Sequence, residues 1–249
     1  MKRWTFLNPT LIALSTCAAS SIALGSEKPS GKEILAEIIE RGRAFENAYL
    51  GSYSRREAKV EVLGDDGGDP KMTRYIVVDV WDYHGEPPIN EVRECKIDNE
   101  AVELAECVEK RQLDPVHRLF GAKSEEHYRM EYRGLSTWKG QASHKVGVIP
   151  LEETMRHLKG DVFFHDETLQ VVGMDVTLGD YPFGLKDLSI QLSFAEQEGK
   201  PVIESGDSSV HVYVPLLINE RTHTRFTASM QRLLVERHTT MAGTEMGAQ

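Results

Sequence analysis

The chain has 249 residues, 40% hydrophobic and 27% charged, a composition typical of a globular protein with one domain or two small ones. Its formal net charge at pH 7 is −10. Nucleic acids and anionic membrane surfaces attract basic patches, and the sequence has no basic run, so both are disfavoured as main partners.

Residues 1–25 have the three-part layout of a signal peptide. Lys2 and Arg3 form a charged start, and an apolar run with small residues leads to a cleavage site after Gly25. The run is too short and interrupted for a membrane span, which needs roughly 20 consecutive apolar residues. We therefore expect an exported, periplasmic protein. An uncleaved membrane anchor and lipidation at Cys17 are the alternatives.

One amphipathic helix is predicted after a short polar linker. Ser30 and Glu33 have the spacing of a capping box, and Gly51 supplies a C-terminal stop. Between them, apolar residues at helical intervals form a single stripe: Ile34, Leu35, Ile38, Phe45 and Tyr49. We expect this helix to cover a sheet as a lid.

Beyond the helix the hydrophobic period changes to two. Residues 59–63 and 73–83 are β-rich runs joined by the loop at 64–70. The aspartates of that loop give it the carboxylate density of a weak calcium site, but the late bidentate acid that an EF-hand-type site needs is missing. We interpret the loop as a solvated turn.

The long connection from Gly85 to Phe120 includes a predicted strand and carries two cysteines, Cys95 and Cys107. In an oxidising compartment such a pair is a disulfide candidate, worth on the order of 3 kcal/mol. Two unpaired buried cysteines are the alternative. No CxxC motif or histidine cluster of ligand spacing accompanies them, so we expect no metal.

The remaining predicted strands are short and closely spaced. They are 89–97, 128–133, 142–150, 158–165, 170–178, 188–195, 210–218 and 222–234, and short helical pieces are predicted at 101–110 and 115–120. Apolar residues alternate with polar ones from Leu188 to Ala195, which indicates one buried and one solvated face. Such strands favour an antiparallel meander over βαβ units. We expect one domain at 30–237 and a disordered tail at 238–249.

The alternating apolar residues form the candidate ligand-binding face. They are Ile76, Val78, Val80, Val162, Phe164, Leu188, Ile190, Leu192, Phe194, Val210, Val212 and Val214. This face is either an ordinary core under the helix or a carrier cavity that the helix leaves partly open. An acyl chain in such a cavity would gain about 0.8 kcal/mol per buried methylene without any polar contact.

Catalytic chemistry has no local signature in this sequence. GxSxG, HExxH, P-loop and GxGxxG motifs are absent, although a triad set by space alone could exist without them. Residues His165-Asp166-Glu167 fit a hairpin tip. His211 with Tyr213, and His223 with Arg225, fit solvent-facing positions of strands. We expect no cofactor.

Two segments resemble the hairpins of outer-membrane lipoprotein-sorting proteins of the LolA-like superfamily. The first is Tyr132-Arg133-Gly134-Leu135-Ser136-Thr137-Trp138-Lys139-Gly140-Gln141, and the second runs from His157 to Val172. The resemblance implies a mainly β (α+β) fold, an unclosed antiparallel half-barrel with covering helices, whose cavity holds acyl chains. The second segment departs from its relatives by lacking a tryptophan at 162–165 and by carrying Leu169 in place of a turn glycine.

These features together predict a non-enzymatic exported protein that binds a lipid or the acylated end of a lipoprotein. The lid helix or the connection from Gly85 to Phe120 would move to admit the ligand. A periplasmic sensor or scaffold that binds an envelope protein is the alternative, and a hydrolase is less favoured.

Overall fold

The computed structural model describes residues 29–47, 50–64, 68–83, 86, 88–107, 119–120, 123–197, 200–215 and 218–234. The expected signal peptide and C-terminal tail lie outside these residues. So do the centre of the acidic loop, at 65–67, and most of the helical piece expected at 115–120.

The described chain forms eleven strands and few helical turns. In chain order the elements are α1 (Gly31–Asn47), β1 (Gly51–Leu63), β2 (Met72–Tyr83), β3 (Ile89–Ile97), β4 (Glu100–Ala101), α2 (Leu104–Cys107), η1 (Ser124–Glu126), β5 (Tyr128–Trp138), β6 (Gln141–Pro150), β7 (Leu158–His165), β8 (Val171–Leu178), β9 (Leu185–Gln197), β10 (Lys200–Val214) and β11 (Ile218–Leu234). No described helix is both long and apolar enough to span a bilayer.

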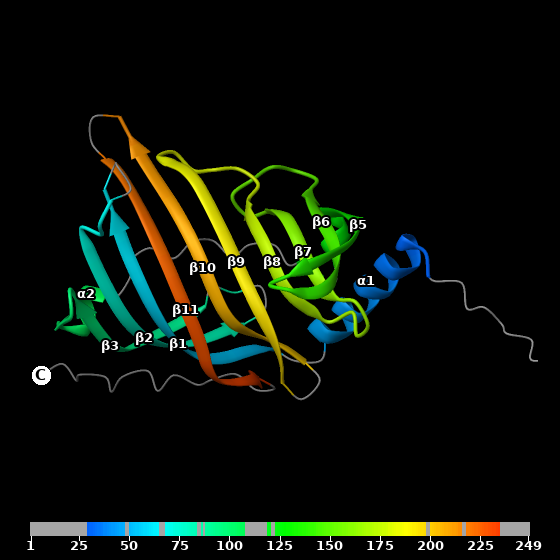
Figure 1. The fold of residues 1–249 in the computed structure, drawn as a ribbon, viewed down its shortest axis with the longest axis horizontal. Coiled ribbons are helices and arrows are strands. Elements are labelled where there is room, and N and C mark those ends of the chain that lie inside the picture. Colours follow the sequence, from blue (N-terminus) through cyan, green and yellow to red (C-terminus); the bar gives the residue numbers. More distant parts are fainter. Residues whose placement is uncertain are drawn as a thin grey trace, which may run out of the picture.

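All of the strands belong to one sheet in the order β4-β3-β2-β1-β11-β10-β9-β8-β7-β6-β5, with antiparallel pairing throughout (Figure 1). Two meanders, β1 to β4 and β5 to β11, are joined where β1 pairs with β11. The sheet ends at β4 and β5 without closing on itself. The expected unclosed antiparallel half-barrel is therefore confirmed.

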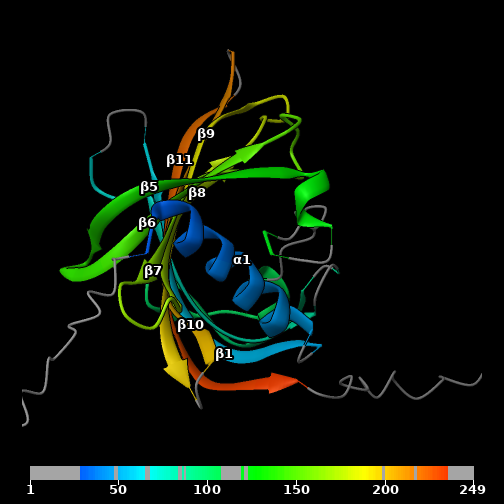
Figure 2. The ribbon, with the colours of Figure 1, turned by 90° about the vertical axis from the view of Figure 1, so that its right-hand side faces the viewer.

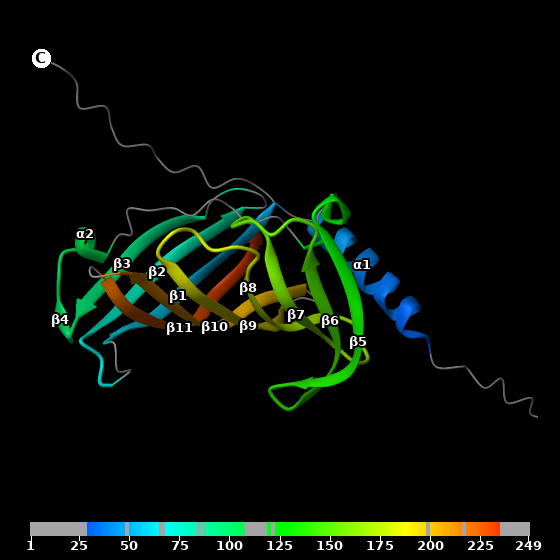
Figure 3. The same cartoon turned by 90° about the horizontal axis from the view of Figure 1, so that it is seen from above.

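Helix α1 lies in the hollow of the curved sheet, near its β5 to β8 end (Figures 2 and 3). Its residues Ile34 and Ile38 are buried and join a core with Val146, Val162 and Phe164. The helix begins as its sequence predicts, because Ser30 N–H donates to Glu33 Oε2 at 2.7 Å and Glu33 N–H donates to Ser30 Oγ at 3.4 Å.

Turn chemistry fixes the hairpins that the sequence indicated. Lys139 and Gly140 both have positive φ, 47° and 87°, in the two-residue turn between Trp138 and Gln141. Two positive φ values define a type I′ turn, whose twist suits a hairpin. Leu169, in the turn between β7 and β8, also has a positive φ, 54°, although it is not a glycine.

Several strand boundaries expected from the sequence are wrong, and the largest errors concern β10 and β11. The run at 210–218 is not one strand, because β10 ends at Val214 and β11 begins at Ile218. Residues 200–209 belong to β10 but were not predicted as strand, since glycine, aspartate and serines there mask the period-two pattern.

Two expectations at helix ends also need correction. Gly51 begins β1 and does not follow a helix as its stop; a Cβ there would clash with the backbone carbonyl of Asp82 on β2. Within the helical piece expected at 101–110, α2 covers Leu104–Cys107, Ala101 instead pairs with Lys96 as strand β4, and residues 108–110 lie outside the described part of the chain.

Cys95 and Cys107 form a disulfide with a Cα–Cα distance of 6.1 Å. Cys95 lies on β3 and Cys107 ends α2, so the bond fixes this short helix to a strand next to the sheet edge. Of the two alternatives left open by the sequence, the bonded one is found.

Candidate functional site

The strand register defines the concave face of the sheet, the face against which α1 packs. One row of cross-strand partners on it runs through Val162, Met174, Leu192, Gly206, Phe226, Ala58 and Ile76. Partners opposite each other in a ladder point to the same side, and residues two apart on a strand do too. The twelve residues predicted for the ligand-binding face therefore all occupy concave positions.

A cavity of about 510 Å³ lies between α1 and this face. Its lining among the described residues comprises Ile38, Arg41, Gly42, Ala44, Ser52, Asp82, Leu119, Phe120, Val162, Phe164, Leu169, Gln170, Val171, Met174, Phe194, Pro201, Val202, Ile203 and Leu233. The volume is within the range of small-molecule sites, and the lining is mainly apolar with a few polar groups, as such sites usually are.

Only some of the predicted face borders this cavity. Val162, Phe164 and Phe194 line it, and Ile38 of the lid helix forms part of its roof. The other predicted face residues, which are Ile76, Val78, Val80, Leu188, Ile190, Leu192, Val210, Val212 and Val214, share the concave face but are not among the lining residues. The reason is the position of α1, which roofs one part of the long sheet.

Several lining residues were not predicted. Val202 and Ile203 lie in the part of β10 that the sequence did not reveal as strand, and Leu169 lies in a turn. Leu169 is buried in the core and holds a positive φ there. The absence of a turn glycine in the second hairpin was the one sequence signal that pointed to it.

Helix α1, which forms the roof of the cavity, is held on the sheet by apolar and polar contacts. Phe120 packs edge-to-face on Phe164 with ring centroids 5.8 Å apart, and its ring also lies against Gly42 of α1, where a Cβ would not fit without a shift. Leu35 packs partly buried against the core. The side chain of Phe45, and Tyr49 as a whole, lie outside the described part of the lid.

Arg41 connects the roof to the β7–β8 turn. Its guanidinium donates to the Thr168 carbonyl oxygen at 2.6 Å and to Glu37 Oε1 at 2.5 Å. The cation thus has a carboxylate partner on its own helix and a second contact on the sheet. Arg41 therefore lines one side of the cavity, and its charge is already paired with Glu37.

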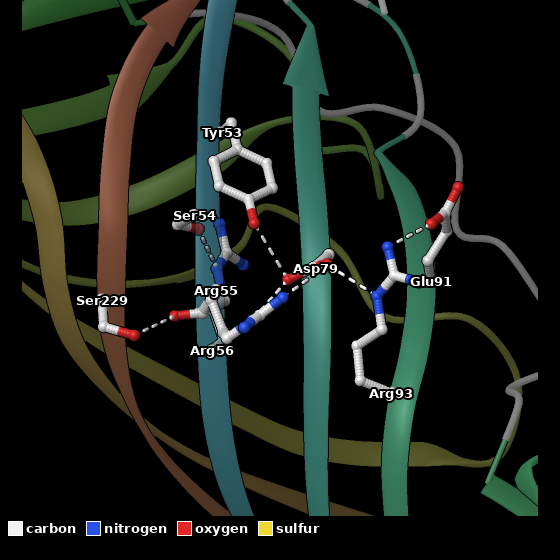
Figure 4. A network of polar contacts seen from close by, with 8 residues as sticks. All are labelled: Tyr53, Ser54, Arg55, Arg56, Asp79, Glu91, Arg93 and Ser229. Atoms are coloured by element: carbon white, nitrogen blue, oxygen red, sulfur yellow. Dashed lines mark hydrogen bonds and ion pairs between the residues drawn. The ribbon is translucent and has the colours of Figure 1, made fainter. Parts of the chain in front are cut away.

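On the opposite, convex face, a charge network joins β1, β2 and β3 (Figure 4). Asp79 is 2% exposed and accepts hydrogen bonds from Tyr53 Oη at 3.0 Å, Arg55 Nε at 2.8 Å and Arg93 Nε at 2.6 Å. The Arg55 hydrogen bond is the largest cause that lowers the pKa of Asp79, to about 2. This network faces away from the cavity and acts as a clamp between strands.

The histidine groups singled out in the sequence do not form a reactive centre. His165 Nδ1 accepts from the backbone N–H of Glu167 and Thr168 within the β7–β8 turn. On the convex face, His211 Nε2 contacts Asn219 at 2.9 Å, and both His223 and Arg225 contact Asp207, at 2.7 and 3.0 Å. Tyr213 is 44% exposed.

Within the described residues, no three His, Cys, Asp or Glu side chains gather closely enough to hold a metal ion. The centre of the acidic loop, at residues 65–67, lies outside the described part of the chain.

No protein-family model matches the sequence, and a comparison with curated proteins finds no match. Among solved structures, the chain is similar to a domain described as an outer membrane lipoprotein-sorting protein from Vibrio parahaemolyticus, with 11% identity, a TM-score of 0.45 and coverage of 87% of this chain and 96% of that one. It is also similar to a LolA superfamily protein from Nitrosomonas europaea, with 8% identity, a TM-score of 0.42 and coverage of 85% and 96%.

A further similar structure is a complex of MucA and MucB from Pseudomonas aeruginosa, with 9% identity, a TM-score of 0.24 and coverage of 83% of this chain and 99% of that one. LolA-superfamily structures are thus among those that this chain resembles, as the two hairpins predicted. These three TM-scores are below one half, and it is the unclosed antiparallel sheet of the chain itself that defines its fold.

Proposed function

We propose that this protein is a non-enzymatic, exported carrier that binds a lipid or the acylated end of a lipoprotein in the cavity under α1. The observation that carries the proposal is the cavity itself, about 510 Å³ and walled mainly by aliphatic and aromatic side chains. Each methylene that enters it from water gains about 0.8 kcal/mol, so a long acyl chain could bind without a specific polar contact.

Two further features support this proposal. The Cys95–Cys107 disulfide suits an oxidising compartment outside the cytoplasm, in agreement with the signal peptide expected at 1–25. The position of α1 suits a lid, because the described part of the helix packs one apolar side on the sheet, and Arg41 adds a contact to the β7–β8 turn. In the proposed mechanism α1 tilts away from Phe164 to admit a chain.

The carrier function is tested by adding a fluorescent fatty acid to the purified mature protein and by extracting it for lipid mass spectrometry. The variant Met174→Trp places a large ring in the cavity wall and should abolish uptake. Asp175→Trp is the matched control, because its side chain is the next one on β8 and is exposed on the other face. Wild-type protein that carries no lipid and takes up no probe would rule out the carrier function.

A binding surface for an envelope protein is the second candidate function. Phe183, in the turn between β8 and β9, is 93% exposed, and Ile218 at the start of β11 is 47% exposed. The β8–β9 turn lies beside the end of β10, since Tyr213 N–H donates to the Gly184 carbonyl oxygen at 2.7 Å. If this end of the sheet binds a protein partner, Phe183→Ser should lose a specific crosslink to it while fatty-acid uptake stays unchanged.

A further inference from the structure

Two arginines occupy concave positions of the sheet, and most of the other concave positions of β1 and β2 carry small or apolar side chains. In β1, Arg56 lies between Ser54 and Ala58 on this face, and in β2, Arg74 lies opposite Val60. An apolar row formed by Ala58, Ile76 and Phe226 separates the two arginines. Burying a cation on the inner face of a half-barrel costs free energy, because the charge loses its contact with water, so an interaction or a function must offset this cost.

Arg56 has contacts but forms no ion pair among the described residues. Its guanidinium carbon lies 5.2 Å from the centroid of the Phe226 ring, and its Nε donates to Ser54 Oγ at 3.1 Å. Desolvation by burial is the main influence on this group and lowers its pKa, while the charge of Asp82 acts in the opposite direction. No carboxylate of the described chain forms an ion pair with it.

Arg74 repeats this situation further along the face. Its Nε is buried and has no hydrogen-bond partner in the described part of the chain. Its cross-strand neighbours, Val60 on β1 and Ile97 on β3, are apolar. The contrast with the convex face is sharp, because Arg55 and Arg93 there both pair with Asp79.

The geometry directs Arg56 toward the cavity. Because its Nε reaches Ser54, the side chain runs back along β1 in the direction of Ser52, which lines the cavity. Ser52 is paired across the ladder with Asp82, the one acid at the concave positions of β1 and β2. The cation among the described lining residues, Arg41, is already paired with Glu37. Within the described part of the chain, Arg56 is thus a cation next to the cavity that forms no ion pair.

We propose that Arg56 binds the anionic group of an amphiphile whose apolar chain occupies the cavity under α1. A guanidinium offers a planar fork of N–H donors that matches a carboxylate or phosphate in a bidentate arrangement, and Ser54 Oγ adds a hydroxyl beside it. The inference deepens the proposed carrier function and rests on it. It narrows the ligand class from any acyl chain to an amphiphile with a negatively charged head.

The test compares ligands of equal chain length and different head group: palmitate, hexadecanol and palmitoyl lysophosphatidic acid. Their affinities are measured by displacement of a fluorescent fatty probe from wild-type protein and from Arg56→Gln, Arg56→Lys and Arg221→Gln. The last variant removes an exposed arginine of β11 and serves as the charge-matched control. Wild type and Arg221→Gln should bind palmitate about tenfold more tightly than hexadecanol, the worth of one charge-assisted contact.

Arg56→Gln should lose this preference and bind hexadecanol as wild type does, which also shows that its cavity is folded. Arg56→Lys should keep part of the preference for palmitate over hexadecanol. If Arg56→Gln does not fold, this variant tests the anion site in its place. The affinity of palmitoyl lysophosphatidic acid relative to that of palmitate shows whether the site prefers a phosphate or a carboxylate head. Equal binding of palmitate and hexadecanol by wild type, or an unchanged preference in Arg56→Gln, overturns the anion site but leaves the carrier function standing. Failure of wild type to bind any of the ligands overturns both.

Discussion

Arg55 and Arg56 are neighbours in the chain and have opposite environments. Arg55 points to the convex face, where the Asp79 carboxylate binds it at 2.8 Å. Arg56 points to the concave face, where a phenyl ring and a serine hydroxyl are its contacts. The pleat of β1 alone separates them, because successive side chains of a strand point to opposite sides. One arginine thereby joins two strands, and the other forms no ion pair among the described residues.

The Asp79 network should make stability depend on acid. The pKa of Asp79 is lowered from 3.8 to about 2 in the folded protein, so its ionised form stabilises the fold above pH 4, and this contribution disappears as the pH falls toward 2. The shift corresponds to about 2 kcal/mol of unfolding free energy. Urea unfolding of wild type and Asp79→Asn at pH 7 and near pH 2.5 measures it.

We expect Asp79→Asn to be less stable at pH 7 by about 2 kcal/mol or more and to show a flatter decline with acid. Asp175→Asn, which changes an exposed carboxyl of β8, should follow the wild-type curve. Parallel curves for wild type and Asp79→Asn would show that the network does not control acid stability.

At the scale of elements, α1 depends on its first turn. The reciprocal hydrogen bonds of Ser30 and Glu33 satisfy N–H groups that the helix itself leaves without partners. Ser30→Ala should therefore destabilise the protein by about 1 kcal/mol and increase hydrogen exchange in α1 above that in the sheet. Lys32→Ala, at an exposed position of the same turn, should change neither quantity. Uniformly increased exchange would mean that α1 does not open separately.

Helix α2 depends on the disulfide as α1 depends on its capping hydrogen bonds. Without the bond between Cys95 and Cys107, the four-residue helix has too few contacts of its own to stay on β3. The double variant Cys95→Ser, Cys107→Ser should lose about 3 kcal/mol in urea unfolding. Its unfolding curve should also be insensitive to a reducing agent, whereas wild type with reductant should approach the variant. An equally stable variant would show that the sheet holds this region without the bond.

At the scale of the whole molecule, the cavity exists because α1 roofs an unclosed sheet near one end. Ile38 is 1% exposed and contributes both to the core and to the cavity wall. Replacing it with alanine should cost about 3 kcal/mol in unfolding free energy and enlarge the cavity.

The enlarged cavity gives a second readout for Ile38→Ala. The variant should accept a bulkier fluorescent fatty acid than wild type does, provided that stability remains sufficient at the assay temperature. Glu40→Ala, on the exposed side of α1, should alter neither stability nor ligand size. Unchanged stability of Ile38→Ala would show that the helix is not packed on the sheet in solution.

Local patterns determined much of this architecture. The helical stripe with its capping box, the Lys139-Gly140 turn and the alternation along 188–195 each depend on residues close together in the chain. For the same reason the concave face could be assigned from the sequence, since a period of two sorts side chains by side. The strand at 200–209 was missed because its serines and glycine carry no such period.

The tertiary structure alone decided where the cavity lies and what borders it. Leu169 becomes a wall residue through a left-handed turn, and Phe120 through packing under Gly42, neither of which leaves a periodic trace. The pairing of Cys95 with Cys107 and the partners of each arginine likewise depend on which strands meet across the sheet. Sequence periodicity gives the side of a strand on which a residue lies. Only the fold determines whether that side meets a helix, a counterion or an open cavity.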